Sequence, residues 1–189
     1  MNLDSGRGTT LWRVDRWDED QTRWVQRRSG LAAPQPADFT QRHVAPYLTT
    51  ELLGNLITTA GWARLSNLLI GTASTQALDA THTRIGVGDA TTPAEAYTDA
   101  DLAAAAGSTH RWFQVVSAAG TVGTRTLAFS ATFGTADGNF AWNEFGIDVG
   151  STASGNTVAA LLFNHKVGIS QGTKASGQTW TATATVSWT

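Results

Sequence analysis

The 189-residue sequence contains no cysteine, a single methionine and only four prolines. Without cysteine the chain forms no disulfide bonds and no thiolate metal sites, so any unusual durability would come from another source, most simply from oligomerisation. Charged residues make up only 15% of the chain and the formal net charge is −2. Because this charge balance creates no general attraction to nucleic acid, we expect no direct nucleic-acid partner.

Long apolar runs are also missing from the sequence. No stretch approaches the roughly 18 apolar residues of a membrane helix, and the first ten residues, MNLDSGRGTT, have no apolar segment typical of a signal peptide. We therefore expect a protein that is made in a cytoplasm and has no membrane partner.

The residues that replace the missing charge are threonine, serine, alanine and 19 glycines, a composition typical of β-structure. From residue 72 onward apolar and polar residues alternate with period two, between turns of glycine, serine, asparagine and aspartate. The pattern predicts strands within 81–89, 111–119, 124–134, 138–149, 157–169 and 178–188, with a loop and a weak helical turn over 90–106. In the last strand one face is apolar and consists of Trp180, Ala182, Ala184, Val186 and Trp188.

One long helix is predicted at about residues 50–70, because apolar residues recur there at helical spacing. Thr49 or Thr50 would cap its start and Gly71 would end it. Gly54 and Gly61 either weaken this helix or permit close packing. The predicted fold class of residues 46–189 is therefore mainly β (α+β), an antiparallel β-sandwich or barrel with one long helix.

Residues 1–45 differ from the rest of the chain and are predicted to form an extended N-terminal arm. The segments LWRVDRW and TRWVQRR flank the polar DEDQ, which suggests a β-hairpin, and a proline-containing linker follows over residues 31–46. The hairpin has little apolar volume, so it would pack either on its own domain or on a neighbouring protein. Tryptophan and arginine dominate binding hot spots, and the candidate partner-binding residues are Trp12, Arg13, Arg16, Trp17, Arg23, Trp24, Arg27 and Arg28.

The motifs that could indicate catalysis or metal binding are weak. Residues 168–172 match the G-x-S-x-G motif of serine hydrolases, but no acid or histidine follows them and the next segment is a strand. The four histidines, His43, His82, His110 and His165, are isolated in the sequence. We predict no catalytic residue, no metal ligand and no cofactor.

The segment FGTADGNFAWNEFGI, residues 133–147, combines acids, glycines and aromatics. Asp137, Gly138 and Asn139 could belong to a calcium loop, but their spacing favours a hairpin turn. After this turn, Glu144 is either a buried acid with a partner or a group at the rim. The residues predicted to lie in the core or in a subunit interface are Phe140, Trp142, Glu144, Phe145, Trp180 and Trp188.

Two other interpretations of this segment remain open. A sugar-binding platform would require Trp142 or Trp112 to be exposed for stacking. An enzyme that degrades polysaccharide would require a pair of carboxylates across a cleft, and Glu144 with Asp148 or Asp137 is the only such pair on a structured segment.

Three blocks together resemble a recurrent domain in virion structural proteins of tailed bacteriophages, which are described as head decoration (cement) proteins or as minor tail and fibre proteins. The blocks are TRIGVGDATT, TLAFSATFGTADGNFAWNEFGID and LLFNHKVGISQGTKASGQTWTATATVSW. The resemblance covers roughly residues 50–189, and residues 1–45 lie outside it.

The resemblance implies a non-enzymatic, β-rich virion component that is often a homotrimer and has no cofactor. On this basis we expect a capsid decoration protein that is assembled in the host cytoplasm and binds the major capsid protein on the outer surface of the head. The alternative is a minor tail or tail-fibre protein whose β-domain binds glycans of the host surface.

Overall fold

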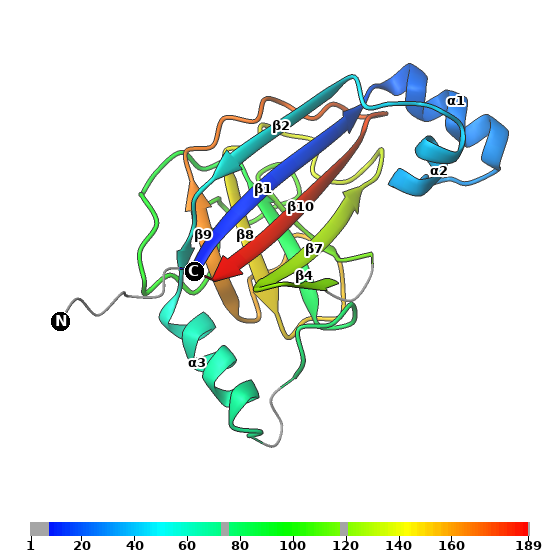
Figure 1. Cartoon of the computed structure of the whole chain (residues 1–189). Helices are drawn as coiled ribbons and strands as arrows, with labels where there is room; N and C mark the ends of the chain where they lie inside the picture. Colours follow the sequence, from blue (N-terminus) through cyan, green and yellow to red (C-terminus); the bar gives the residue numbers. More distant parts are fainter. Residues whose placement is uncertain (1–7, 73–75, 118–120, 189) are drawn as a thin grey trace.

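The structure, a computed structural model, describes residues 8–72, 76–117 and 121–188. Two five-stranded antiparallel sheets pack face to face as a β-sandwich (Figure 1). The first sheet has the order β2-β1-β10-β7-β6, with bounds β1 Gly8–Trp17, β2 Leu48–Leu53, β6 Thr121–Gly123, β7 Thr126–Phe133 and β10 Thr179–Trp188. The second has the order β3-β9-β8-β4-β5, with bounds β3 Leu56–Ile57, β4 Thr83–Gly88, β5 Arg111–Val115, β8 Glu144–Val149 and β9 Leu162–Val167. The predicted mainly-β fold is confirmed, and it is a sandwich.

The first and last strands of the chain are neighbours in the first sheet, where Figure 1 shows β1 in blue beside β10 in red. Their register runs from Gly8 opposite Trp188 to Trp17 opposite Thr179. Since these strands lie far apart in the sequence, pairing them joins the two ends of the chain within one layer.

Large aromatic side chains fill the space between the sheets. Trp12 stacks on Phe145 of the other sheet, with ring centroids 4.7 Å apart. Trp142 meets Phe133 and Trp180 edge-on, at 4.7 and 4.9 Å. Each such side chain buries a large apolar area, and this burial is the main contribution to the stability of the sandwich.

The prediction of an N-terminal arm with a β-hairpin is wrong for the described residues. β1 lies inside the first sheet between β2 and β10, and the second half of the predicted hairpin is helix α1, Glu19–Ser29. Asp18 and Gln21 form a capping box at the start of this helix, and Gly30 ends it in a left-handed conformation. The predicted linker contains a second helix, α2, Pro36–Gln41. Residues 1–7 of the predicted arm lie outside the described residues.

The single long helix predicted at about 50–70 is also wrong in its first half. Residues 48–57 form β2 and β3, and helix α3 spans only Thr59–Leu69. Gly54 turns the chain between the strands at a φ of 124°, and the hydroxyl of Thr58, not of Thr49 or Thr50, caps the helix by accepting a hydrogen bond from Gly61 N. A Cβ at Gly61 would collide with the backbone of Phe163, so this glycine permits close packing of α3 on β9.

The strand alternation predicted near the C-terminus is confirmed, with one exception. On β10 the apolar face points into the core, and Trp180, Ala182 and Val186 are buried. Thr179 and Thr181 on the opposite face are buried as well. The hydroxyl of Thr181 lies 3.1 Å from that of Thr132 on β7, so these two hydroxyls satisfy each other within the sheet. Among the described helices, none is long and apolar enough to cross a membrane.

Candidate functional site

Helices α1 and α2 project from the end of β1 as a small unit, which we call the helical cap (residues 18–46) (Figure 1). The cap has its own apolar cluster, in which Trp17 stacks on Phe39 with centroids 4.4 Å apart and Val25 is buried beside them. The indole N–H of Trp17 donates a hydrogen bond to Val44 O at 3.1 Å. This cluster fixes α1 at one end of the sandwich.

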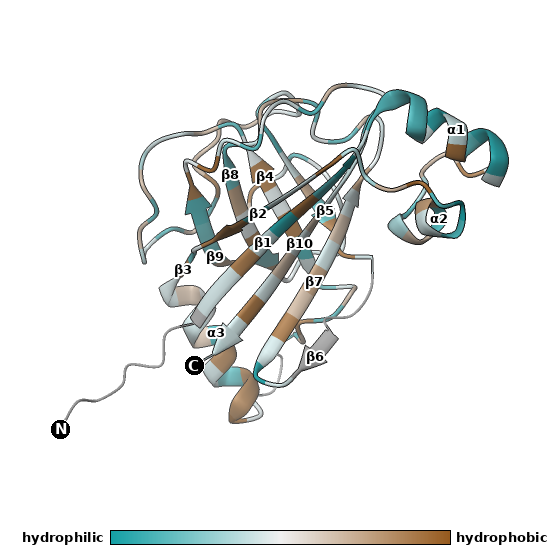
Figure 2. Ribbon diagram, turned by 45° about the horizontal axis from the view of Figure 1, so that its top comes forward, coloured by the Kyte–Doolittle hydropathy of each residue, from teal (hydrophilic) through white to brown (hydrophobic). Residues whose placement is uncertain are grey.

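The outward face of α1 carries three arginines and one aromatic ring, with the exposed acids Glu19 and Asp20 in the first turn. Arg23, Arg27 and Arg28 are exposed, and the guanidinium of Arg28 lies over the ring of half-buried Trp24, 4.6 Å from its centroid. Figure 2 shows the helix as one of the most hydrophilic elements of the molecule. Arginine stacked on tryptophan is preorganised for binding, because both side chains lose little freedom when a partner arrives.

Three of the eight residues predicted to bind a partner lie in the interior instead. Trp12, Arg16 and Trp17 are at most 4% exposed, so their assignment as surface anchors is wrong. Arg16 donates hydrogen bonds to the backbone and side-chain oxygens of Gln171, both at 2.9 Å, and lies over the ring of Trp180. The alternation in LWRVDRW could have indicated that Trp12 and Arg16 are buried, because residues 12, 14 and 16 share one face of a strand.

The other five predicted residues are accessible but do not form one surface. Arg13 lies on the outer face of β1 and pairs with Asp15 at 3.0 Å, whereas the rest of the set lies on α1. The structure therefore brings together four of the predicted residues, namely Arg23, Trp24, Arg27 and Arg28.

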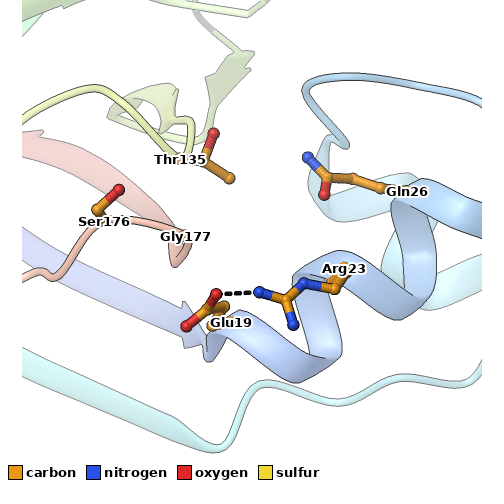
Figure 3. Close-up of a pocket in the computed structure, with 6 residues that line it drawn as sticks. All are labelled: Glu19, Arg23, Gln26, Thr135, Ser176 and Gly177. Carbon is orange, nitrogen blue, oxygen red and sulfur yellow. Dashed lines mark hydrogen bonds and ion pairs between the residues drawn. The ribbon is translucent and has the colours of Figure 1, made fainter.

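A polar crevice adjoins α1 where the cap meets the loops of the sandwich (Figure 3). Its volume is about 260 Å³. One wall is the ion pair of Glu19 and Arg23, and the opposite side presents the hydroxyls of Thr135 and Ser176. The full lining is Glu19, Arg23, Gln26, Thr135, Ser176 and Gly177. None of the described residues that line the crevice is aromatic, so its chemistry suits a polar chain segment better than a stacked sugar.

An apolar groove lies at the opposite end of β1, between α3 and the first sheet. Its volume is about 490 Å³. Trp62 and Leu69 contribute from α3, and Leu127 and Trp188 from the sheet. Leu69 is 87% exposed and Ile70 77%, which is unusual for large apolar side chains unless another surface covers them.

The residues predicted as core or subunit interface lie mainly in the core. Phe140, Trp142, Glu144, Phe145 and Trp180 are buried, and Trp188 is half-buried beside the groove. Because Trp142 is fully buried, it cannot stack on a sugar. Trp112 is half-buried, and its indole N–H donates to Gln114 Oε1 at 3.0 Å.

The turn at residues 134–139 is held by a buried ammonium group. Lys174 Nζ donates hydrogen bonds of 2.7 Å to Gly134 O and to Asn139 Oδ1, and Gly138 adopts a φ of 64°. Burial lowers the pKa of Lys174 to about 8, and the nearby charge of Asp137 acts in the opposite direction. The chain therefore turns here, but the turn joins β7 of the first sheet to β8 of the second, so the predicted hairpin is not formed. The side-chain oxygen of Asn139, which could have been a calcium ligand, is bonded to Lys174.

The candidate carboxylate pair is engaged within the fold. Asp148 forms a buried ion pair with Arg84, and Glu144 accepts a hydrogen bond from His165 at 2.6 Å. Ser170 of the G-x-S-x-G match lies in the loop between β9 and β10 and makes no hydrogen bond to a described histidine. Within the described residues, no group of three or more acids and histidines is arranged to hold a metal ion.

Comparisons of the chain with protein families, with curated proteins and with solved structures found no match. The functional proposal therefore depends on the sequence blocks and on the geometry of the surfaces described above.

Proposed function

We propose that the protein is a structural component of a tailed-phage virion that decorates the outer surface of the head. In this proposal the outward face of α1 binds an acidic surface of the major capsid protein. The observation that carries the proposal is the position of Arg27, Arg28 and Trp24 on a helix that projects from the sandwich on its own apolar cluster. The resemblance of residues 50–189 to virion structural proteins supports the same function.

A decoration protein gains avidity when several copies bind around a symmetry axis of the shell, each through a modest contact. We propose a homotrimer for this reason. The apolar groove between α3 and the first sheet lies at the end of β1 remote from α1, so subunits that met there would leave α1 free for the capsid. Light scattering on the purified protein measures the number of subunits directly.

The proposal is tested by co-sedimentation of the protein with empty head shells that lack it. We expect Arg27→Glu to weaken binding at least about tenfold, because reversing one hot-spot charge costs about 1.4 kcal/mol or more. Arg27 is exposed and makes no side-chain hydrogen bond to another described residue, so the fold should be unaffected.

Arg13→Glu is the matched control, since it reverses the same charge at an exposed residue of β1 that lies neither on α1 nor in the apolar groove. The control should bind shells as the unmodified protein does. Equal binding by all three proteins would contradict the role of α1. Binding to isolated tails, and not to heads, would support the minor tail protein instead.

A further inference from the structure

Residues 89–110 cross the outer face of the second sheet as an irregular segment, which we call the strap. The strap connects β4 to β5 and contains no described helix or strand, so the helical turn predicted over 90–106 is not formed. Two of its side chains, Leu102 and Ala104, are buried against the sheet. Leu102 packs with Phe113 and Leu162 in an apolar cluster separate from the main core.

Glycines on β4 and β8 form the floor under the strap. A Cβ on Gly86 or on Gly146 would lie 3.1 Å from a methyl group of Leu102. A Cβ on Gly88 would lie 2.8 Å from the side chain of Ala104. All three distances are shorter than packed carbon atoms normally approach. The sheet therefore has a recess whose shape matches the side chains of the strap.

A buried histidine joins the strap to the sheet through two carboxylates. His165 on β9 is 2% exposed, and its Nδ1 lies 2.5 Å from Asp99 Oδ2 of the strap. Its Nε2 lies 2.6 Å from Glu144 Oε1 of β8. Glu144 in turn accepts hydrogen bonds from the backbone N–H groups of Ala103 and Ala104, at 2.5 and 3.1 Å. His165 is thus joined to the strap directly at Asp99, and through Glu144 at Ala103 and Ala104.

With both carboxylates ionised, this arrangement requires a charged imidazole. A neutral ring carries one N–H, so it could donate to only one carboxylate and would direct a lone pair at the other. Burial is the largest single influence and lowers the pKa of His165, but hydrogen bonds and charge from Glu144 and Asp99 outweigh it and raise the pKa overall. The imidazolium is therefore the form that satisfies both partners.

The other charged groups near the strap form ion pairs of their own and do not take the place of the proton on His165. Lys166, next to His165, pairs with Glu95 of the strap at 2.7 Å, and Arg111 on β5 pairs with Asp101 at 2.6 Å. β3 carries no charged residue, and the single charged residue of α3, Arg64, makes no ion pair with His165. The lysine and arginine attachments hold the strap beside the histidine.

We propose that the strap is a pH-dependent latch, which the imidazolium of His165 holds closed over the glycine floor and which opens when that proton is lost. Because the folded state raises the pKa of His165, this stabilisation is complete below its ordinary value of 6.5 and is lost as the pH rises through the folded value. Opening would expose Leu162 and the glycine floor on the outer face of the second sheet.

Hydrogen exchange of the full chain between pH 6 and pH 9.5 tests the latch. The signal is the protection of the amides of Ala103 and Ala104, corrected for the pH dependence of intrinsic exchange. We expect protection to fall by up to about tenfold for each pH unit between the ordinary pKa of 6.5 and the higher pKa of folded His165, as for one linked proton, and to level off above the folded value. Constant protection over this range would overturn the proposal.

Two variants distinguish the role of the His165 proton in holding the strap from the role of the other attachments. In Asp99→Asn the amide can donate to a neutral imidazole, which then donates to Glu144, so the strap should stay closed and its protection should become independent of pH. Asp101→Asn removes an attachment to an arginine, and it should lower protection by a similar factor at every pH. If Asp99→Asn retained the pH profile of the unmodified protein, the proton of His165 would not hold the latch closed.

Discussion

The sandwich core and the cluster of the helical cap are both built on aromatic side chains, but they differ in how many elements support them. The sandwich core receives buried residues from strands of both sheets, with Trp12, Trp142 and Trp180 among the largest. The cap cluster has three buried residues, Trp17, Val25 and Phe39, from one strand end and two short helices. Stability is therefore concentrated in the sandwich, whereas the surface proposed to bind the capsid depends on a small cluster.

This difference implies that the cap can open while the sandwich stays folded. Local opening is easiest where few buried apolar groups hold a segment, and the cap satisfies that condition. The following predictions test the comparison, from the largest expected effect on global stability to the smallest.

Replacing Trp142 should unfold the sandwich most readily. Trp142→Ala removes a fully buried ring that contacts Phe133 and Trp180, and we expect a loss of about 3–5 kcal/mol in the free energy of unfolding. Chemical denaturation measures this loss. Trp24→Ala on the cap is the control, because its ring is only half-buried and its removal should cost less than about 1 kcal/mol. A stable Trp142→Ala variant that had lost glycan binding would instead indicate a surface role for this ring.

Because of Lys174, the stability of the sandwich should vary with pH in the alkaline range. Its pKa is lowered to about 8 from an ordinary 10.5, so the unfolded state binds more protons between these values and stability should rise with pH across that window. Below about pH 8 the full cost of the buried charge is present. The shift corresponds to at most about 3 kcal/mol, and we expect about 1–3 kcal/mol.

The variant Lys174→Met isolates this effect, because methionine has a similar length and no charge. The difference in unfolding free energy between the two proteins, measured from pH 7 to pH 10.5, should change in favour of lysine as the pH rises. A constant difference would show that Lys174 keeps its ordinary pKa in the folded protein.

Six of the seven described strands after residue 80 could be predicted because their alternation and their turns are local features, whereas β6 lies outside the predicted segments. The core position of Phe145 and Trp180 follows from the same alternation, since one face of each strand must be buried. The two-sided environment of β8 was also predictable, because apolar residues occur on both alternating faces of residues 140–147.

The N-terminal half of the chain could not be predicted as well, because its structure depends on distant partners. β1 is a strand next to β10, and nothing near Trp12 in the sequence indicates that a strand more than 160 residues away covers it. Helix α1 had a local signal in Asp18 and Gln21, which match a capping box, but the aromatic and arginine pattern suggested a second strand. The partner of Glu144 was not predictable either, since His165 reaches it only through the pairing of β8 with β9.

The smallest effect on global stability is expected from Phe39→Ala in the cap. This change removes one ring of the stacked pair with Trp17, so it should open α1 and α2 locally and lower the unfolding free energy of the sandwich by less than about 1 kcal/mol. Phe129→Ala makes the same chemical change on β7 in the sandwich core and should cost about 3–5 kcal/mol.

Limited trypsin digestion completes this test, because the cap contains Arg23, Arg27, Arg28 and Arg42 as cleavage sites. Phe39→Ala should be cut at these arginines at least about tenfold faster than the unmodified protein, which corresponds to about 1.4 kcal/mol of local stability. Phe129→Ala should show no such preference for the cap. If Phe39→Ala lowered the stability of the sandwich as much as Phe129→Ala, the cap and the sandwich would unfold as one unit, and the binding surface could not be altered independently of the fold.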